Sequence, residues 1–225
     1  MPHNQLSHIF REGFPFWEEL SDADKDSLLR SSYQASFKKG THIHDGNECT
    51  GIILLKTGSL RLYLLSPDGK EVTLYRLYPG DVCILSASCL LEAITFDVSV
   101  DAEEDSECIV VGSCALEELS RRIPAVKLYT LETALSRFSD VMWAMQQILF
   151  MSMDKRLAIF LLDECAKTGS DTLKLTHEQI AKYMGSAREV ITRMLKYFVS
   201  EGLVSSSRGE GIRLLNKPGL RLLTL

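Results

Sequence analysis

Residues 176–196 read THEQIAKYMGSAREVITRMLK and contain the start signals of two short helices. Residues 176–179 form a capping box, in which the threonine hydroxyl caps the helix start and the glutamine reaches back. Gly185 supplies the turn, and residues 186–189 form a second capping box ten residues further on. Two short helices joined by a tight turn that contains glycine predict a helix-turn-helix.

The second helix of this pair separates an apolar face from a polar face. At about 100° per residue, the apolar side chains cluster on one side: Val190, Ile191, Met194 and Phe198. The other side carries Arg188, Glu189, Thr192, Arg193 and Lys196. Arginine can bond two acceptors of guanine, and glutamate can accept from cytosine N4. The pattern favours a helix that reads base edges over a solvated face held by a Glu189–Arg193 pair.

A β-hairpin is predicted after this helix. Residues 203–204 and 212–215 are apolar and flank a loop rich in serine and glycine at 205–211. Such a hairpin forms a wing whose loop can lie on phosphates, and cations there add salt-dependent affinity. The predicted phosphate contacts of the whole C-terminal part are Thr176, His177, Ser186, Thr192, Lys196, Arg208 and Arg213.

The charge of the chain is uneven. Residues 1–153 carry 13 Lys and Arg against 22 Asp and Glu, a balance of −9, whereas residues 154–225 carry 12 against 8, a balance of +4. A basic C-terminal part on an acidic protein indicates a polyanion partner for that part alone.

Three evenly spaced turns organise the first half of the chain. Gly58, Gly69 and Gly80 lie eleven residues apart, and Asp-Gly and Pro-Gly pairs are strong turn signals. The stretches around them are rich in branched and aromatic residues and predict strands at 52–55, 60–65, 72–77 and 109–111. This spacing is typical of a β-roll or barrel. A helical stretch is expected before it at 6–31, and the acidic residues 101–107 are expected in a solvated loop or strand face.

A long helix is predicted after Pro124. Apolar residues recur at alternating spacings of three and four: Leu128, Leu131, Leu135, Phe138, Met142, Met145 and Leu149. A seam of this length is buried best against a copy of itself, so we expect a parallel homodimer helix. A core helix packed on its own barrel is the alternative.

The fold class is therefore α+β, with a β-roll at 1–123, a dimerisation helix at 124–153 and a winged helix-turn-helix at 154–225. Apolar residues make up 45% and charged residues 24% of the 225 residues, which excludes disorder as a description of the whole chain. No membrane-spanning stretch or secretory signal is found, so a cytoplasmic protein is expected. Paired carboxylates, a nucleophile–base signature and a phosphate loop are not found either, and we do not expect an enzyme.

This organisation resembles the cyclic-AMP receptor and fumarate–nitrate regulator (Crp/Fnr) superfamily of bacterial transcription factors. The resemblance is carried by residues 176–181, 186–193 and 201–204, with the upstream turns matching the cupin-like, cyclic-nucleotide-binding-like β-roll of the family. It implies a homodimer that reads pseudo-palindromic DNA and acts with RNA polymerase. The positions that match the family's base-reading residues are Arg188, Glu189 and Arg193. Arginine at 188 resembles the cyclic-AMP receptor branch and implies TGTGA-like half-sites.

This chain departs from the family at the positions that would bind the signal molecule. Leu85 stands where cyclic-AMP binders carry glutamate, and residues 95–96 are Thr-Phe instead of Arg-Ser or Arg-Thr. A buried phosphate without a cation is costly, which disfavours cyclic AMP. No cysteine precedes Cys49, which disfavours an iron–sulfur cluster.

Haem remains a candidate cofactor through which the β-roll senses its signal. Residues 89–93 resemble a segment of the family's haem-based carbon-monoxide sensor, although the Cys and His ligands of that sensor fall on Ile84 and Ser86 here, which leaves Cys83 as a candidate ligand. The candidate effector-pocket residues are Cys83, Leu85, Ser86 and Cys89. Neither the effector nor the choice between activation and repression follows from the sequence.

The six cysteines admit two interpretations. Cys83 with Cys89, and Cys108 with Cys114, could form a thiol switch if one thiol were exposed and had a lowered pKa. Small buried apolar side chains are the favoured interpretation. His42 and His44 alternate on a predicted strand and are expected at the surface, and no metal site is predicted.

Two functions remain from the sequence. The first is a homodimeric DNA-binding regulator whose β-roll senses a signal. The alternative is a β-roll dimer whose winged helix binds protein instead of DNA.

Overall fold

The computed structural model describes residues 3–45, 50–87, 97–207 and 210–225. They form two compact units, residues 1–65 with 74–142 and residues 66–73 with 143–225. Each unit has its own hydrophobic core. Within the described residues, no helix is both long and apolar enough to cross a membrane.

The N-terminal helical stretch is divided into three pieces: α1 (His3–Gly13), η1 (Pro15–Glu19) and α2 (Asp22–Arg30). The division has local causes. Pro15 cannot continue α1 because it lacks a backbone N–H, and it begins the 3-10 helix instead. Ser21 caps α2 by accepting from the Asp24 amide at 3.2 Å. The expectation of helix over 6–31 is correct in type, but it missed these breaks.

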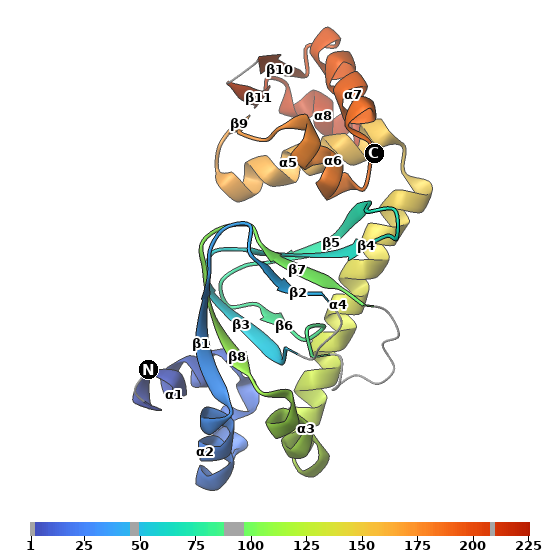
Figure 1. Cartoon of the computed structure of the whole chain (residues 1–225). Helices are drawn as coiled ribbons and strands as arrows, with labels where there is room; N and C mark the ends of the chain where they lie inside the picture. Colours follow the sequence, from blue (N-terminus) through green and yellow to red (C-terminus); the bar gives the residue numbers. More distant parts are fainter. Residues whose placement is uncertain (1–2, 46–49, 88–96, 208–209) are drawn as a thin grey trace. The chain divides into compact units, whose positions relative to one another are not determined.

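Two antiparallel four-stranded sheets form the roll (Figure 1). The strands of the first sheet, in spatial order, are β1 (Ser32–Phe37), β8 (Ser106–Val111), β3 (Ile52–Thr57) and β6 (Val82–Cys83). Those of the second are β2 (His42–His44), β7 (Ser99–Ala102), β4 (Leu60–Leu65) and β5 (Glu71–Leu77). The three predicted strands around the glycine turns are β3, β4 and β5. The acidic stretch contains the end of β7 and the start of β8.

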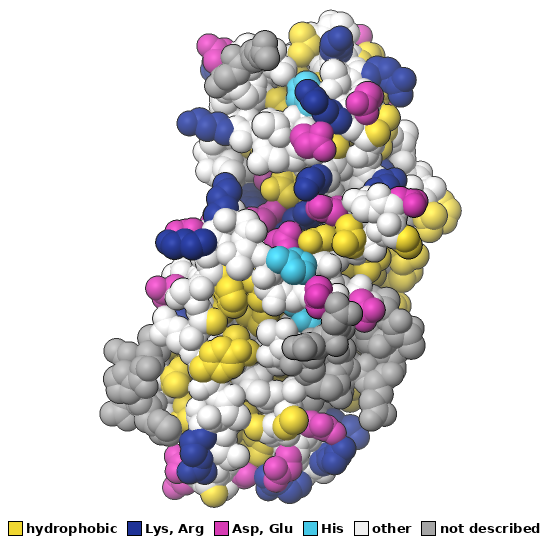
Figure 2. Space-filling model, viewed as in Figure 1, with side chains coloured by type: hydrophobic (Ala, Val, Ile, Leu, Met, Phe, Trp, Pro, Cys, Tyr) yellow, Lys and Arg dark blue, Asp and Glu magenta, His cyan; other side chains and the backbone are white. Residues whose placement is uncertain are grey.

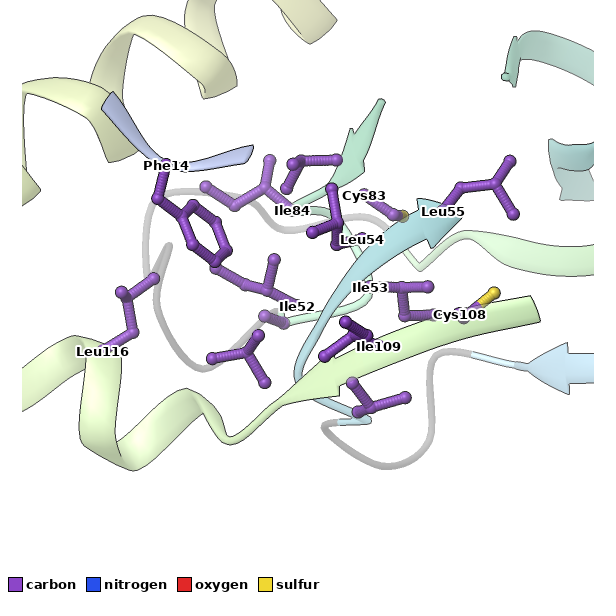
Figure 3. Packing of buried hydrophobic residues seen from close by; sticks show 14 of the residues in the cluster. Phe14, Ile52, Ile53, Leu54, Leu55, Cys83, Ile84, Cys108, Ile109 and Leu116 are labelled. Carbon is purple, nitrogen blue, oxygen red and sulfur yellow. The ribbon is translucent and has the colours of Figure 1, made fainter. Parts of the chain in front are cut away.

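The core of the roll is formed by the inner faces of both sheets and by the helices at their end. Figure 3 shows side chains of Phe14, β3, β6, β8 and α3 (Ser113–Arg122) directed into one cluster. Ile52, Ile53 and Ile109 have no exposed surface. At about 1.5–3 kcal/mol for each fully buried side chain, this cluster is the main source of stability for the roll.

Helix α4 (Pro124–Phe150) follows the roll and leaves an apolar stripe at the surface. The seven predicted seam residues are between 45% and 68% exposed in the single chain: Leu128, Leu131, Leu135, Phe138, Met142, Met145 and Leu149. Figure 2 shows hydrophobic side chains along the edge of the molecule that α4 occupies. The helix is therefore not a core helix packed on its own roll along this face.

The second unit contains α5 (Met153–Thr168), α6 (His177–Met184), α7 (Arg188–Ser200) and α8 (Lys217–Leu223). A three-stranded sheet accompanies them, in the order β10 (Val204–Ser207), β11 (Gly211–Leu214) and β9 (Thr172–Leu173). The hairpin β10–β11 is the predicted wing, and β9 is an additional strand that pairs with β11.

The turn between β3 and β4 gives a stability prediction. Gly58 has φ +86°, and a Cβ there would lie 2.6 Å from the carbonyl oxygen of Asp105. Gly69 has a similar φ of +77° with no atom within 4 Å of such a Cβ. Ala at either site should cost about 1–2 kcal/mol for the left-handed conformation.

We expect Gly58→Ala to cost roughly 1–3 kcal/mol more than Gly69→Ala, because the backbone must also shift. Urea unfolding of both variants measures the difference. Equal losses would show that the contact with Asp105 does not constrain this turn.

Candidate nucleic-acid interface

Helix α6 begins with the predicted capping box. The Thr176 hydroxyl accepts from the Gln179 amide at 3.1 Å, and the Gln179 side chain accepts from the Thr176 amide at 2.8 Å. The helix ends at Gly185, which has φ +59°, a left-handed conformation that suits glycine. The turn to α7 then takes two residues, Ser186 and Ala187.

The prediction of a second capping box at 186–189 is wrong. The residue that caps α7 is Ala187, with an extended backbone and no side-chain bond. Ser186 therefore lies one position before the cap, where its hydroxyl does not cap the first turn. Glu189 consequently lies at the second helical position, and its carboxylate is exposed at the surface.

Helix α7 has the two faces that its sequence predicts. Ile191, Leu195 and Phe198 are at most 1% exposed and pack in the core of the second unit. Val190 and Met194, which were predicted on the apolar face, are half-buried. The opposite face forms a shallow depression lined by Arg188, Glu189, Thr192, Arg193 and Lys196. The structure thus brings the three predicted base-reading residues together with two predicted phosphate contacts.

A larger groove lies beside this depression. It has a volume of about 710 Å³ and is bounded by the start of α6, the start of α7 and the two wing strands. Its polar lining consists of Lys174, Thr176, His177, Glu178, Arg188, Ser206 and Ser207. Lys174, Ser206 and Ser207 were not predicted. Their positions, just before the Thr176 cap and within the Ser-rich wing, are the sequence signals that point to them.

His177 connects the two helices of the motif. Its Nδ1 lies 2.9 Å from the Thr192 hydroxyl, across fifteen residues of sequence. Burial, and then the neighbouring Arg188, lower the pKa of His177 below its ordinary value. The ring is therefore neutral near pH 7.

Two further predicted phosphate contacts, Ser186 and Arg213, do not line either concavity. Arg213 is exposed on β11, between the buried Ile212 and Leu214, so it lies on the outer face of the wing sheet. Ser186 is half-buried in the turn. Arg208 falls outside the described residues.

Three of the candidate effector residues in the roll, Cys83, Leu85 and Ser86, are deeply buried. Cys83 and Leu85 belong to the hydrophobic core, and burial raises the pKa of the Cys83 thiol. The Ser86 hydroxyl donates to the Gly51 carbonyl oxygen at 2.7 Å, which is a structural role. Cys89 falls outside the described residues. Burial also raises the pKa of Cys108 to about 12, which agrees with the favoured interpretation of these thiols as buried apolar groups, whereas Cys114 is exposed.

A polar cluster that sequence reasoning missed joins the roll to α4. Arg137 of α4 pairs with Asp81 at 3.2 Å and with Asp140 at 3.1 Å. Its guanidinium lies 5.2 Å from the ring centre of Tyr75. The Tyr75 hydroxyl is buried without a hydrogen-bond partner among the described residues. The signal was available in the sequence, because Arg137 is one of only two cations in α4, with Lys127.

The two histidines of β2 differ, and the prediction that both lie at the surface is wrong for His44. His42 is exposed and its Nδ1 lies 2.6 Å from Asp101. His44 is 4% exposed and its Nδ1 lies 2.8 Å from the Thr50 hydroxyl. A register shift between the two residues separates their environments. Among the described residues, no three His, Cys, Asp or Glu side chains gather as a metal site requires.

Comparisons with known proteins agree with this architecture. Residues 155–223 match the model of the Crp-like helix-turn-helix domain, and residues 34–122 match the cyclic nucleotide-binding domain. The crystal structure of a Crp/Fnr-family protein from Eubacterium rectale is 46% identical, covers 94% of this chain and 98% of its own, and superposes with a TM-score of 0.90. The cyclic AMP receptor protein of Thermus thermophilus is 24% identical over 88% of this chain and 91% of its own.

The fold is also that of FixK2 from Bradyrhizobium japonicum, which is 21% identical, covers 86% of this chain and 98% of its own, and has a TM-score of 0.67. The chain belongs to the Crp/Fnr family. It is a transcription regulator with a helix-turn-helix DNA-binding domain and is not an enzyme.

The capping geometry gives a matched pair of variants. Thr176→Ala removes the hydroxyl that accepts from the Gln179 backbone amide and should destabilise the protein by about 1 kcal/mol. Ser186→Ala removes a hydroxyl that caps nothing and should cost less than about 0.5 kcal/mol. Thermal or urea unfolding compares them. A larger loss for Ser186→Ala would contradict the assignment of the α7 cap to Ala187.

Proposed function

We propose that this protein is a homodimeric, sequence-specific DNA-binding regulator that reads pseudo-palindromic sites with α7 and is controlled by a signal sensed in its β-roll. The observation that carries the proposal is the exposed polar face of α7. Because Ile191, Leu195 and Phe198 hold the other face in the core, Arg188, Glu189 and Arg193 are presented together at the surface. A helix of this kind enters the major groove.

The chemistry of this face suits a G·C-containing half-site. Arginine donates two bonds to guanine O6 and N7, and glutamate accepts from cytosine N4. Arg188, Glu189 and Arg193 are therefore assigned to base reading. The TGTGA-like half-site is proposed from the resemblance of Arg188 to the cyclic-AMP receptor branch of the family. Thr176, His177, Thr192 and Lys196 are assigned to phosphates, which position the protein without reading sequence. Ser186, Arg208 and Arg213 stay in this set as predicted from the sequence.

The apolar stripe of α4 supports the dimer. Its seven seam residues repeat with heptad spacing and are about half exposed or more in one chain. A stripe of this length on a single chain would be an exposed hydrophobic patch, which soluble monomers avoid. We assign it to a second copy of α4.

Control by a signal requires that the roll be coupled to α4. Arg137 supplies one such coupling, since it holds Asp81 of the roll and stacks on Tyr75. A signal that binds in the roll would shift α4 between two arrangements and thereby change the DNA affinity. By analogy with the family, RNA polymerase is the further partner.

Selection of bound duplexes from a random pool tests the proposal as a whole. We expect an inverted repeat with a GTGA core and half-site centres about 10 bp apart. A selected site without a GTGA core would contradict the assignment of Arg188 and Glu189. Failure to select any duplex would favour the alternative in which the winged helix binds protein.

Two substitutions on α7 separate base reading from phosphate contact. Arg188→Met should lose about 1–3 kcal/mol of binding free energy on the selected site and relax the preference at one base pair. Lys196→Met should weaken binding to selected and scrambled duplexes alike and lower the salt slope by about one per chain. Fluorescence anisotropy over a range of salt concentrations measures both. Identical behaviour of the two variants would overturn these roles.

The dimer assignment is tested by Leu135→Glu. Leu135 is 68% exposed in the single chain, so a charge there costs little in a monomer but faces its own copy across the proposed seam. We expect a shift to monomer in sedimentation velocity. Leu65→Glu is the control, because Leu65 is 56% exposed but lies on β4. If Leu135→Glu stays as dimeric as Leu65→Glu, the α4 seam is wrong.

A further inference from the structure

His177 occupies an unusual place in the helix-turn-helix. It is the first residue of α6, it lines the groove between the two helices and the wing, and it is half-buried. Its bond to Thr192 crosses to the middle of α7, on the face that carries Arg193 and Lys196. One side chain therefore connects the start of α6 to the exposed face of α7.

The bond to Thr192 settles which ring nitrogen is available. Nδ1 is engaged by the Thr192 hydroxyl at 2.9 Å, so Nε2 is the atom left to meet a ligand. When the threonine hydroxyl donates to Nδ1, the neutral ring carries its proton on Nε2 and donates outward. When the ring is protonated, both nitrogens donate, to Thr192 and to the ligand.

The groups around this groove favour an anion. Lys174, from the segment before α6, and Arg188, from α7, are the cations that line it. Glu178, the residue after His177 on α6, is its one acidic lining residue within the described part of the chain. The wing adds the hydroxyls of Ser206 and Ser207. Lys174, the hydroxyls of Thr176 and Ser206, and the imidazole suit the non-bridging oxygens of a phosphodiester, whereas the Ser207 hydroxyl already donates to Glu210.

We propose that His177 is a positioning and proton-accepting phosphate contact: Thr192 holds its ring so that Nε2 donates to a DNA phosphate in the groove, and DNA binding takes up a proton there. This inference rests on the proposed function, because the anion is the backbone of the bound duplex. It goes beyond that function by making the DNA affinity depend on pH through one residue.

The direction of the pH dependence follows from the charges. In the free protein, burial and Arg188 hold the pKa of His177 below its ordinary value of 6.5. A phosphate at Nε2 favours the imidazolium and raises the pKa of the same ring in the complex. The complex therefore binds more protons than the free protein, and DNA affinity rises as pH falls between the bound and free pKa values. The rise is at most about tenfold per pH unit for each chain.

The experiment measures DNA affinity by fluorescence anisotropy between about pH 5.5 and 8, across the range in which histidine titrates. The probes are a duplex with two inverted TGTGA half-sites and a scrambled duplex of the same length. Phosphate contacts do not read sequence, so the pH slope should appear with both. The full-length wild type is compared with His177→Gln, whose amide N–H has a similar reach but does not titrate. His42→Gln is the control for histidine titration elsewhere.

We expect the DNA affinity of His177→Gln to change less steeply with pH than that of the wild type, by up to one proton taken up per chain. His42→Gln should retain the wild-type slope. Thr192→Val removes the orienting bond together with the phosphate contact assigned to Thr192, so it should weaken binding about 3- to 10-fold and also reduce the pH slope as His177→Gln does. Thr192→Ser, which keeps the hydroxyl, should restore both the affinity and the slope. Unfolding midpoints of all variants separate these effects from loss of structure.

An unchanged slope in His177→Gln would overturn the proton uptake, and equal affinities of Thr192→Val and Thr192→Ser would overturn the positioning role. Failure of the wild type to bind either duplex would overturn the proposed function and this inference with it. Binding without a contribution of His177 to the slope overturns this inference alone.

Discussion

The orientation of α7 is the constraint on which the interface depends. Ile191, Leu195 and Phe198 lie at spacings of four and three and are together almost fully buried. At about 1.5–3 kcal/mol for each buried side chain, they outweigh any single contact that the exposed face makes. Rotating the helix by one residue toward the C-terminal neighbours would place Thr192 and Lys196 in that core, which is far more costly. The polar face is therefore held outward before any ligand is present.

The groove and the depression follow from this packing. With α7 held in place, the turn at Gly185, where α6 ends, positions α6 beside it. The bond between His177 and Thr192 then links the start of α6 to α7. The wing strands then complete the groove with serine hydroxyls. In the other unit, only part of the surface of α4 is buried. Part of the helix packs on the roll through Val126 and Tyr129, while its apolar stripe remains open for a partner.

Local signals in the sequence predict the parts of this structure that depend on local chemistry. The Thr176 capping box, the Gly185 turn, the wing hairpin and the strands around Gly58 and Gly69 all depend on neighbouring residues, and each is where the sequence predicts it. The heptad stripe of α4 is likewise a periodic signal, and the structure leaves it exposed. The polar residues of α7 were predicted together because a helix places them on one face.

The misses have a common physical cause, which is pairing between distant parts of the chain. β1 exists through its register with β8, whose paired residues lie 69 to 79 positions away in the sequence. Arg137 meets Asp81 across 56 residues, and the buried His44 lies on β2 in register with Val100 of β7. The second capping box failed for a local reason. A Ser-x-x-Glu spacing is compatible with a helix that starts one residue later, and only the backbone at Ala187 decides between the two.

The central claim is that two copies of α7 read two halves of one DNA site. The most direct measurement is the mass of the complex by sedimentation on duplexes that carry two inverted half-sites or only one. The account predicts two chains on each duplex with both half-sites. It also predicts a large loss of affinity when one half-site is scrambled, since each mismatched base pair typically costs about 1–3 kcal/mol. One chain per duplex, with an affinity that does not change when the second half-site is removed, would contradict it.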